Sequence, residues 1–286
     1  MLWSRRSVLK TAALSAAYGA CRPLVAEAAD VSAAASAPDD KQFHGLRVGV
    51  CSYSMRSLPA AEALQDAKRL GVRYLSLKDA HLPLTASPDE RRQFRQQAEQ
   101  MGLTITSCGV IYMKNDETQM RQALDYVRDM GASVAVVGVS HEMLPTLDKV
   151  IRDYDLTAAI HNHGPNDKLF PSPLEVYSAV KGLDRKIGLC MDIGHTFRMH
   201  EDLVADVKKT RDRLYSMHFK DLDSGELKAK GVPVGTGVLP IIPLLRELVH
   251  SHYSGEVQLE YEVEPKDPVP GMAESFGFMR GVLQAM

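Results

Sequence analysis

The stretch Gly188-Leu189-Cys190-Met191-Asp192-Ile193-Gly194-His195 begins with an apolar run of strand length and ends in a carboxylate and an imidazole. Apolar runs bounded by turn residues are typical of buried strands. The same pattern returns in three further places, so groups that can bind a ligand repeatedly follow a buried strand. The other three stretches are Ala158-Ala159-Ile160-His161-Asn162-His163-Gly164, Tyr215-Ser216-Met217-His218-Phe219-Lys220-Asp221 and Val257-Gln258-Leu259-Glu260-Tyr261-Glu262.

Strand-like and helix-like segments alternate along the chain on both sides of these stretches. Alternation of this kind predicts a parallel sheet whose strands are joined by crossover helices. The predicted strands cover residues 46–52, 72–77, 103–108, 133–139, 156–160, 186–191, 214–219 and 256–261, and the predicted helices cover residues 60–70, 87–101, 117–130, 142–154, 173–181, 201–213, 240–251 and 272–284.

The sequence therefore predicts an α/β fold, a single (β/α)8 TIM barrel. An open, doubly wound sheet is the alternative, but no Gly-rich G-x-G-x-x-G turn follows an early strand. Candidate ligands also follow four different predicted strands. A closed barrel gathers the carboxyl ends of its strands at one face, whereas an open sheet would spread these ligands along its edge.

Composition argues against nucleic acid and against a membrane as partners. The 286 residues carry a net charge of −2, which gives no reason to expect binding to a phosphate backbone or an anionic leaflet. No apolar run of 18 or more residues follows the leader, so no transmembrane helix is expected. Cys51, Cys108 and Cys190 lie in separate apolar runs, which favours buried free thiols over a disulfide framework.

The N-terminus resembles a twin-arginine export signal. Ser4-Arg5-Arg6-Ser7-Val8-Leu9-Lys10 is followed by an Ala-rich segment, and Ala26-Glu27-Ala28 supplies a cleavage site. We expect a signal peptide over residues 1–28, a linker over 29–43 and the barrel domain over 44–286, in a periplasmic or otherwise exported protein. The alternative is a lipoprotein anchored through Cys21, but Tyr18 fits that signal poorly.

Four side chains from four consecutive predicted strands form a candidate metal site. Asp192 ends a buried strand and must be paired, hydrogen-bonded or metal-bound, because isolated burial of a carboxylate is costly. Taken singly, each of the four has another interpretation, such as a rim histidine or a turn-forming Asp. Together they offer imidazole nitrogen and carboxylate oxygen, a set that suits Mn, Co, Mg or Zn. The predicted ligands are His161, Asp192, His218 and Glu260.

Other polar residues near the strand ends are candidates for chemistry and for substrate binding. His163 shares a side with His161 by the period of two in a strand, and Lys220 shares a side with His218. We expect His163 and Lys220 to be catalytic. We expect His195, His81 and Lys78 to bind substrate. The roles of base, oxyanion partner and substrate binder stay interchangeable among His163, Lys220 and His195.

Two further features lie between the last two predicted strands. Asp221 points away from Lys220 and is expected to orient a neighbour or cap a turn. The Gly-rich stretch 231–237 either binds a phosphate or forms a loop over the site. The loop is favoured, because no Lys or Ser/Thr stands where a phosphate-binding loop needs it.

With these motifs in place, the chain resembles the xylose-isomerase-like barrel superfamily from about residue 46 to the C-terminus. That group includes sugar isomerases and epimerases, inosose dehydratases and repair nucleases of the endonuclease-four type. The resemblance implies that Asp192, His218 and Glu260 bind a divalent metal and that His195 faces the substrate. The motifs that carry it are His-Asn-His-Gly from His161, Met-Asp-Ile-Gly-His from Met191, Met-His-Phe-Lys-Asp from Met217 and Gln-Leu-Glu from Gln258.

One departure from the family pattern concerns the first ligand. Many members have Glu-Asn-His where this chain has His161-Asn162-His163, and that Glu is both a metal ligand and an acid/base. The change puts a two-glutamate epimerase mechanism in doubt. A chain with His-Asn-His at this place is similar to the dehydratase-like and keto-sugar-processing branches of the family. Those branches include lyases that eliminate the aglycone from 3-keto-glycosides. The repair-nuclease branch would need more histidines and a basic groove.

We therefore expect a divalent-metal-dependent sugar isomerase or epimerase that abstracts a proton next to a carbonyl of a sugar or keto-sugar. A lyase or dehydratase acting by β-elimination on 3-keto-glycosides or inosose-like substrates is the first alternative. A catalytically inactive exported sugar-binding barrel is the second, and a purely structural barrel fits the many rim histidines least well. The expected partner is a small carbohydrate, and because barrels of this type often pair, a homodimer stays open.

Overall fold

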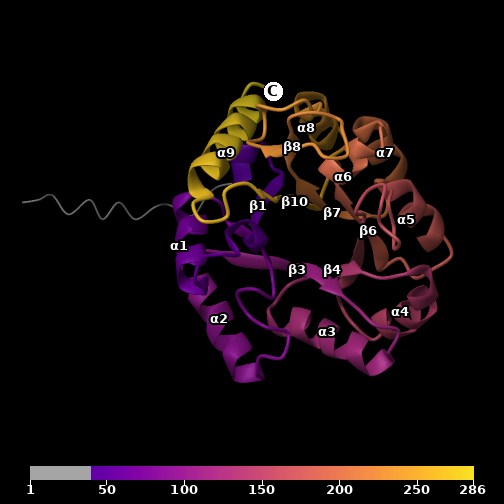
Figure 1. Ribbon diagram of the computed structural model, residues 1–286. Coiled ribbons are helices and arrows are strands. Elements are labelled where there is room, and N and C mark those ends of the chain that lie inside the picture. Colours follow the sequence, from indigo (N-terminus) through magenta and orange to yellow (C-terminus); the bar gives the residue numbers. More distant parts are fainter. Residues whose placement is uncertain (1–39) are drawn as a thin grey trace, which may run out of the picture. The chain divides into compact units, whose positions relative to one another are not determined.

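The computed structural model describes residues 40–286, which form the predicted (β/α)8 barrel (Figure 1). The predicted export signal, Cys21 and the linker up to residue 39 lie outside the described residues. Parallel strands close into a ring in the order β1-β10-β7-β6-β5-β4-β3-β2. In residues 40–286 the strands of the ring are β1 (Arg47–Cys51), β2 (Tyr74–Leu77), β3 (Thr104–Tyr112), β4 (Val134–Gly138), β5 (Thr157–His161), β6 (Ile187–Asp192), β7 (Leu214–Phe219) and β10 (Glu256–Leu259).

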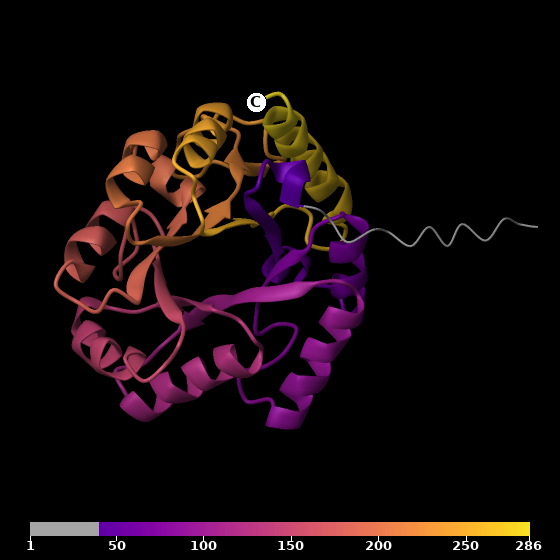
Figure 2. The same ribbon diagram turned by 180° about the vertical axis from the view of Figure 1, so that it is seen from behind.

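Helices surround this ring, and they lie on its outside when it is seen from either face (Figures 1 and 2). Their apolar sides pack on the outer surface of the strands, so each strand is buried on both faces, as its near-continuous apolar sequence requires. The helices are α1 (Ala60–Arg69), α2 (Pro88–Gln100), α3 (Glu117–Asp129), α4 (Leu144–Ile151), α5 (Pro173–Val180), α6 (Ile193–Arg198), α7 (Leu203–Thr210), α8 (Ile241–His250) and α9 (Val269–Gln284), with 3-10 turns η1 (Asp40–Phe43), η2 (Ser52–Met55) and η3 (His141–Met143).

Local signals in the sequence set several helix ends. The Ser87 hydroxyl accepts a hydrogen bond from the backbone N–H of Glu90, and the Glu90 carboxylate accepts one in return from the N–H of Ser87. This capping box satisfies two donors that the first turn of α2 would otherwise leave unpaired. Gly71 and Gly102 follow α1 and α2 with φ values of 71° and 80°, a conformation that favours glycine.

Helix α6 occupies a segment that the sequence predicts as a loop. It begins directly after β6, because Asp192 caps it: the carboxylate Oδ1 accepts a hydrogen bond from the N–H of His195 at 2.8 Å. The Thr196 hydroxyl then donates to the carbonyl of Asp192 at 2.6 Å. The cap therefore fixes the Asp192 side chain at the carboxyl end of the strand.

A small hairpin follows β7 and leads to α8. Its strands are β8 (Asp221–Leu222) and β9 (Gly231–Val232). The Asp221 carboxylate accepts hydrogen bonds from the backbone N–H groups of Gly235 and Gly237 at 2.9 and 3.1 Å. Asp221 thus orients its neighbours, as predicted, and those glycine N–H groups are already bonded to it rather than free to cradle a phosphate.

The first described residues form a short turn that packs against the last helix. Residues 40–43, assigned to the linker, form η1, and Phe43 is buried against α9. Its ring lies edge-on to that of Phe276, with centroids 6.3 Å apart, and Gln42 accepts a hydrogen bond from Arg280. These contacts close the ring between its first and last segments.

Residues 40–286 bear on two further predictions, one about the cysteines and one about membrane-spanning helices. Cys51, Cys108 and Cys190 are buried free thiols, as predicted. No helix in that part of the chain combines the length and the apolarity needed to cross a bilayer.

Candidate active site

The four predicted ligands come together at the carboxyl-terminal end of the barrel. His161 and Asp192 end β5 and β6, His218 is the penultimate residue of β7, and Glu260 follows β10 directly. One donor atom from each lies within 4.8 Å of the others. All four side chains are buried, so each donor is held by packing around its strand end.

The two histidines contact each other and one carboxylate each. Nε2 of His161 lies 3.1 Å from Nδ1 of His218 and 3.5 Å from Oδ2 of Asp192. Nδ1 of His218 lies 3.3 Å from Oε2 of Glu260. Burial lowers the pKa of His161 to about 3, so this ring is neutral and accepts the hydrogen bond that His218 donates.

Lys220 lies between the two carboxylates. Its Nζ is 2.9 Å from Oδ2 of Asp192 and 2.8 Å from Oε2 of Glu260. Burial disfavours the charged form of each of these three groups. The ammonium nevertheless holds the pKa of both carboxyls well below the usual range, and the two carboxylates raise the pKa of Lys220 in turn. The three groups therefore form a buried, ionised triad.

Gly194 makes room for the Lys220 side chain. A Cβ atom on Gly194 would lie 2.6 Å from Cγ and 2.7 Å from Cδ of Lys220. Any larger residue at position 194 must push the lysine stem aside. The first turn of α6 thus helps to aim the ammonium at the carboxylates.

The donor set fits a divalent cation by its own chemistry. Among the described residues, Nδ1 of His161 and Nε2 of His218 are buried atoms without a hydrogen-bond partner. Buried polar atoms are rarely left in this state unless water or a ligand satisfies them. Two imidazoles and two carboxylates are the ligands that borderline and hard divalent ions take in proteins.

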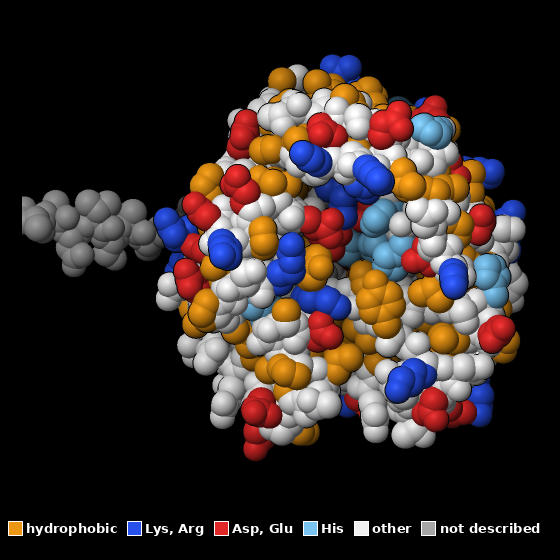
Figure 3. Space-filling model, in the orientation of Figure 1, with side chains coloured by type: hydrophobic (Ala, Val, Ile, Leu, Met, Phe, Trp, Pro, Cys, Tyr) orange, Lys and Arg blue, Asp and Glu red, His pale blue; other side chains and the backbone are white. Residues whose placement is uncertain are grey.

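A cavity of about 150 Å³ opens above these donors. Figure 3 shows histidine and acidic side chains gathered around a hollow in the middle of this face. Aromatic, basic and acidic groups share its wall, so it suits a small polar molecule with a weakly apolar face. The lining residues are Tyr53, Lys78, Val110, Tyr112, His161, His163, His195, Glu260 and Glu262.

His163 is held from both sides at the edge of this cavity. Its Nε2 lies 2.9 Å from the hydroxyl oxygen of Tyr112, and its Nδ1 lies 3.3 Å from Oδ2 of Asp167. Burial lowers the pKa of His163, so the ring is a neutral base near neutral pH. The Tyr112 ring stacks on it and is 58% exposed at the cavity mouth.

The other residues predicted to bind substrate or to be catalytic do not all line this cavity. His195 and Lys78 line the cavity, and Lys78 donates a hydrogen bond to the carbonyl of Val110 at 2.6 Å. His81 is absent from the cavity wall: both of its ring nitrogens lie 3.1 Å from groups of the fold, the Ser52 hydroxyl and the Met55 carbonyl. Lys220 lies behind Glu260 rather than in the cavity wall.

Lys220 instead lines a second cavity of about 230 Å³ beneath the β8–β9 hairpin. Glu260 and Glu262 belong to the walls of both cavities, so the two are neighbours. The wall of the second cavity mixes charged and apolar side chains, with Arg198 as a further cationic group whose buried Nε has no partner among the described residues. Its apolar lining includes Leu222, Ala229, Val232, Val234, Leu259, Tyr261 and Val263.

Sequence reasoning missed four polar or aromatic residues of the site. Tyr53 follows β1 and Tyr112 ends β3, so they obey the same strand-end rule that found the ligands. Asp167 lies in the loop after β5 and Glu262 just beyond β10. Applying the strand-end rule to the first strand would have found Tyr53, whereas Tyr112 lies beyond residue 108, where the third predicted strand ends.

Comparison with known proteins agrees with this geometry. The model of the xylose isomerase-like TIM barrel matches residues 64–282, most of the chain. The chain belongs to the xylose isomerase-like TIM barrel family. Among curated members, inosose dehydratase of Salmonella typhimurium (strain LT2) is 30% identical over 142 residues. The match covers 44% of this chain and 46% of that enzyme, so the chain spans about half the length of this relative.

Solved structures of this family share the fold. The 3-keto-D-glucoside 4-epimerase of E. coli superimposes with a TM-score of 0.69 and 15% identity, over 82% of this chain and 99% of that one. The probable 3-DHS dehydratase of Bacillus anthracis gives a TM-score of 0.68 and 12% identity, over 81% and 97%. At these identities the likeness concerns the fold alone. Members of the family include epimerases and dehydratases, so family membership leaves the reaction of this chain open.

Proposed function

We propose that this chain is a divalent-metal-dependent enzyme that removes a proton next to the carbonyl of a sugar or keto-sugar, with isomerisation or epimerisation as the outcome. The observation that carries the proposal is the convergence of four buried metal-type donors on a cavity that also holds a neutral imidazole, His163. The curated and structural relatives named above, a dehydratase of inosose and an epimerase of 3-keto-D-glucoside, support a polyhydroxylated substrate.

The metal would be held by the four-donor set. The carboxylates of Asp192 and Glu260 provide the negative charge, and the rings of His161 and His218 provide nitrogen ligands. A divalent cation bound there supplies Lewis-acid polarisation of a substrate carbonyl or hydroxyl oxygen.

The residues around the cavity then supply the base and the contacts that hold the substrate. His163, neutral and fixed by Asp167 and Tyr112, accepts the proton from the carbon beside the carbonyl. The exposed ring of Tyr112 offers a stacking surface for the less polar face of a sugar. Lys78 donates hydrogen bonds to substrate hydroxyls from the wall, and His195 donates them or accepts them. Lys220 keeps Asp192 and Glu260 ionised from behind.

Product analysis tests this proposal. The purified chain is incubated with Mn²⁺, Co²⁺ or Mg²⁺ and a panel of aldoses, ketoses and 3-keto-sugars, and the products are identified by NMR. We expect interconversion of isomers with the carbon skeleton intact, loss of activity with chelator, and loss in Asp192→Asn and His163→Gln. A chain with full activity after chelation, or after either substitution, would rule the assignment out.

A second candidate, elimination of the aglycone from a 3-keto-glycoside, is favoured by the second cavity. A keto-sugar ring in the histidine cavity would place its substituent beside Glu260 and Glu262, where the second cavity and its apolar side chains begin. The change Val232→Trp would fill that cavity. Under this candidate it should slow release of an aryl aglycone at least tenfold, yet leave proton exchange in the free keto-sugar unchanged. Equal effects on both substrates, or on neither, would leave isomerisation as the better account.

A further inference from the structure

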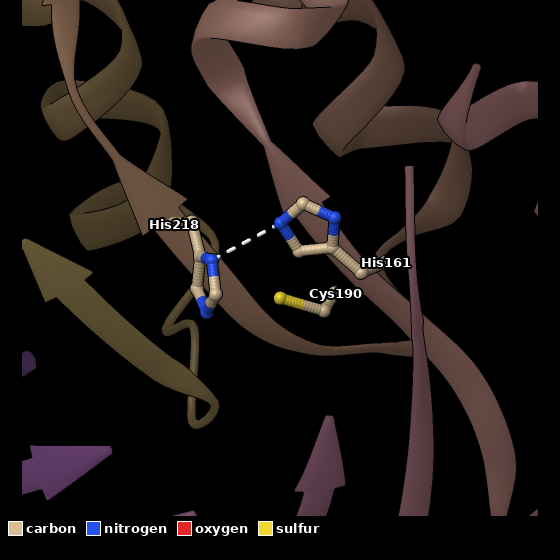
Figure 4. Close-up of side chains that lie close together, drawn as sticks. All are labelled: His161, Cys190 and His218. Carbon is tan, nitrogen blue, oxygen red and sulfur yellow. Dashed lines mark hydrogen bonds between the residues drawn. The ribbon is translucent and has the colours of Figure 1, made fainter. Parts of the chain in front are cut away.

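Beneath the carboxylates lies a second set of possible metal donors that includes sulfur. Cys190 lies on β6, two residues before Asp192, so its side chain points into the barrel one layer deeper. β6 lies between β5, which carries His161, and β7, which carries His218. Figure 4 shows the sulfur of Cys190 beside the two imidazole rings. The donor atoms of these three side chains all lie within 4.8 Å of one another.

The cluster is buried from solvent, and each of its imidazoles has one nitrogen without a hydrogen-bond partner. His161, Cys190 and His218 are 3%, 1% and 1% exposed. Their mutual hydrogen bond uses Nε2 of His161 and Nδ1 of His218, and in the described part of the chain no hydrogen-bond partner reaches Nδ1 of His161 or Nε2 of His218. Buried polar atoms are rarely left without a partner, so two such atoms in one cluster point to a ligand.

The cysteines of residues 40–286 are not equivalent. The thiol of Cys51, on β1, interacts electrostatically with His218 and with Cys190, so two of these three thiols lie near one imidazole. Cys108, on β3, is equally buried but has the Glu256 carboxyl as its charged neighbour.

The donor set with Cys190 also differs in charge from the donor set with Asp192 and Glu260. Lys220 already places an ammonium against Asp192 and Glu260. In the described part of the chain Lys220 also pairs with the Glu262 carboxylate, so its ion pairs lie on the carboxylate side of the histidines. Imidazole and thiolate together are the ligands of Zn²⁺, Cd²⁺ and Cu⁺ rather than of Mg²⁺ or Mn²⁺.

We propose that His161, His218 and Cys190 form a second cation site for a thiophilic ion such as Zn²⁺ or Cd²⁺. Each thiol that ligates the ion releases one proton, and no oxidation is involved. Both imidazoles are shared with the carboxylate site, so the two sites exclude each other. Binding of a thiophilic ion therefore blocks the cation that the proposed reaction needs, although the site itself does not depend on that reaction.

Titration with Cd²⁺ tests the site without measuring activity. The metal-stripped chain is titrated anaerobically while the thiolate-to-metal charge-transfer absorption in the near ultraviolet is recorded. We expect a band that saturates at equimolar Cd²⁺ and Cd²⁺ affinity at least tenfold weaker in Cys190→Ser and in Cys190→Ala, with the fold of both checked by circular dichroism. Cys108→Ser is the matched control and should behave as the parent chain does.

A second arm separates the two donor sets. The double variant Asp192→Asn, Glu260→Gln should lose Mn²⁺ binding, measured by electron paramagnetic resonance of free Mn²⁺, yet keep the Cd²⁺ band. In the parent chain, equimolar Cd²⁺ should release bound Mn²⁺. Absence of the band from the parent chain, its survival in both Cys190 variants, or its loss from the double variant would overturn the proposal. None of these outcomes bears on proton exchange in a sugar, which tests the proposed function alone.

Discussion

The ammonium nitrogen of Lys220 lies 2.8 Å from Oε2 of Glu260, an oxygen that belongs to the same donor set as the two histidines. The lysine thus already supplies a positive charge at the place where the proposed metal would supply one. The two buried carboxylates are balanced by Lys220, with the imidazole of His218 beside Glu260, as long as no metal is bound, and a metal must share them with the lysine.

Replacing Lys220 by Met should therefore make the protein depend on metal for stability. Removing one partner of a buried ion pair costs about 3–5 kcal/mol, because the remaining charge is left buried and unpaired. We expect a large fall in Tm with chelator and recovery of most of it with Mn²⁺. The matched control is Lys149→Met, which removes a surface ion pair with Glu117. A fall in Tm that is the same with and without Mn²⁺ would contradict this account.

Substitution of Gly194 by Ala tests the same relationship without removing a charge. The added methyl group would meet the Lys220 stem at 2.6–2.7 Å, so the ammonium must move away from the carboxylates. We expect tighter Mn²⁺ binding than in the parent chain, measured by isothermal titration calorimetry, because competition from the ammonium weakens. Gly182→Ala, where a Cβ atom meets nothing within 4 Å, serves as the control. Unchanged Mn²⁺ affinity in Gly194→Ala would argue that Lys220 does not compete.

Tyr112 should influence turnover through its hydroxyl and binding through its ring. Tyr112→Phe removes the hydrogen bond to His163 but keeps the stacking surface, so we expect kcat to fall about tenfold with KM nearly unchanged, since one hydrogen bond contributes about 1–1.5 kcal/mol. Tyr112→Ala should raise KM as well. Tyr177→Phe, which loses an equivalent bond to Asp212 on the surface, is the control. A change in KM alone for Tyr112→Phe would place the hydroxyl in substrate binding only.

The raised pKa of Asp206, on α7, should make the stability of the folded protein depend on pH. Burial, together with the neighbouring Glu201, raises the pKa of Asp206 from 3.8 to about 7. The folded chain then holds a proton that the unfolded chain releases between about pH 4 and 7, so stability is full below this window and falls as pH rises through it. The neutral variant Asp206→Asn should flatten this slope and raise Tm at pH 8 by about 2–4 °C, since 1 kcal/mol shifts Tm by about that much in a domain of this size.

Thermal unfolding at pH 5 and pH 8 measures this difference. Asp212→Asn, at an exposed carboxylate, should leave the pH dependence as it is in the parent chain. If Asp206→Asn and Asp212→Asn gave the same pH dependence, Asp206 would not be the group responsible.

The fold could be predicted because its signals are local and repeated. Each strand is a short apolar run, and helix boundaries such as Ser87 and Gly102 are marked by capping residues. Helix α6 was missed, since its start depends on the Asp192 carboxylate turning back to its own backbone. Strand β3 continues past Cys108 to Tyr112 through an irregularity in its pairing with β4, which a count of alternating residues does not reveal.

The candidate site was predictable only where a residue sits at a strand end. His161, Asp192, His218 and Glu260 follow that rule, and the structure brings them together. His81 lies in a loop, and its orientation is decided by contacts with Ser52 and Met55 that no local pattern encodes. Asp167 reaches His163 from a loop for the same kind of reason.

The most direct test of the central claim is solvent-deuterium exchange, followed by proton NMR with the chain, Mn²⁺ and a free 3-keto-sugar in deuterated water. The account predicts loss of the signal from the proton beside the carbonyl in the parent chain, at least a hundredfold slower loss in His163→Gln, and none above the uncatalysed rate after chelation. No exchange with any keto-sugar under any of the three metals would contradict proton abstraction and favour a barrel that only binds sugar.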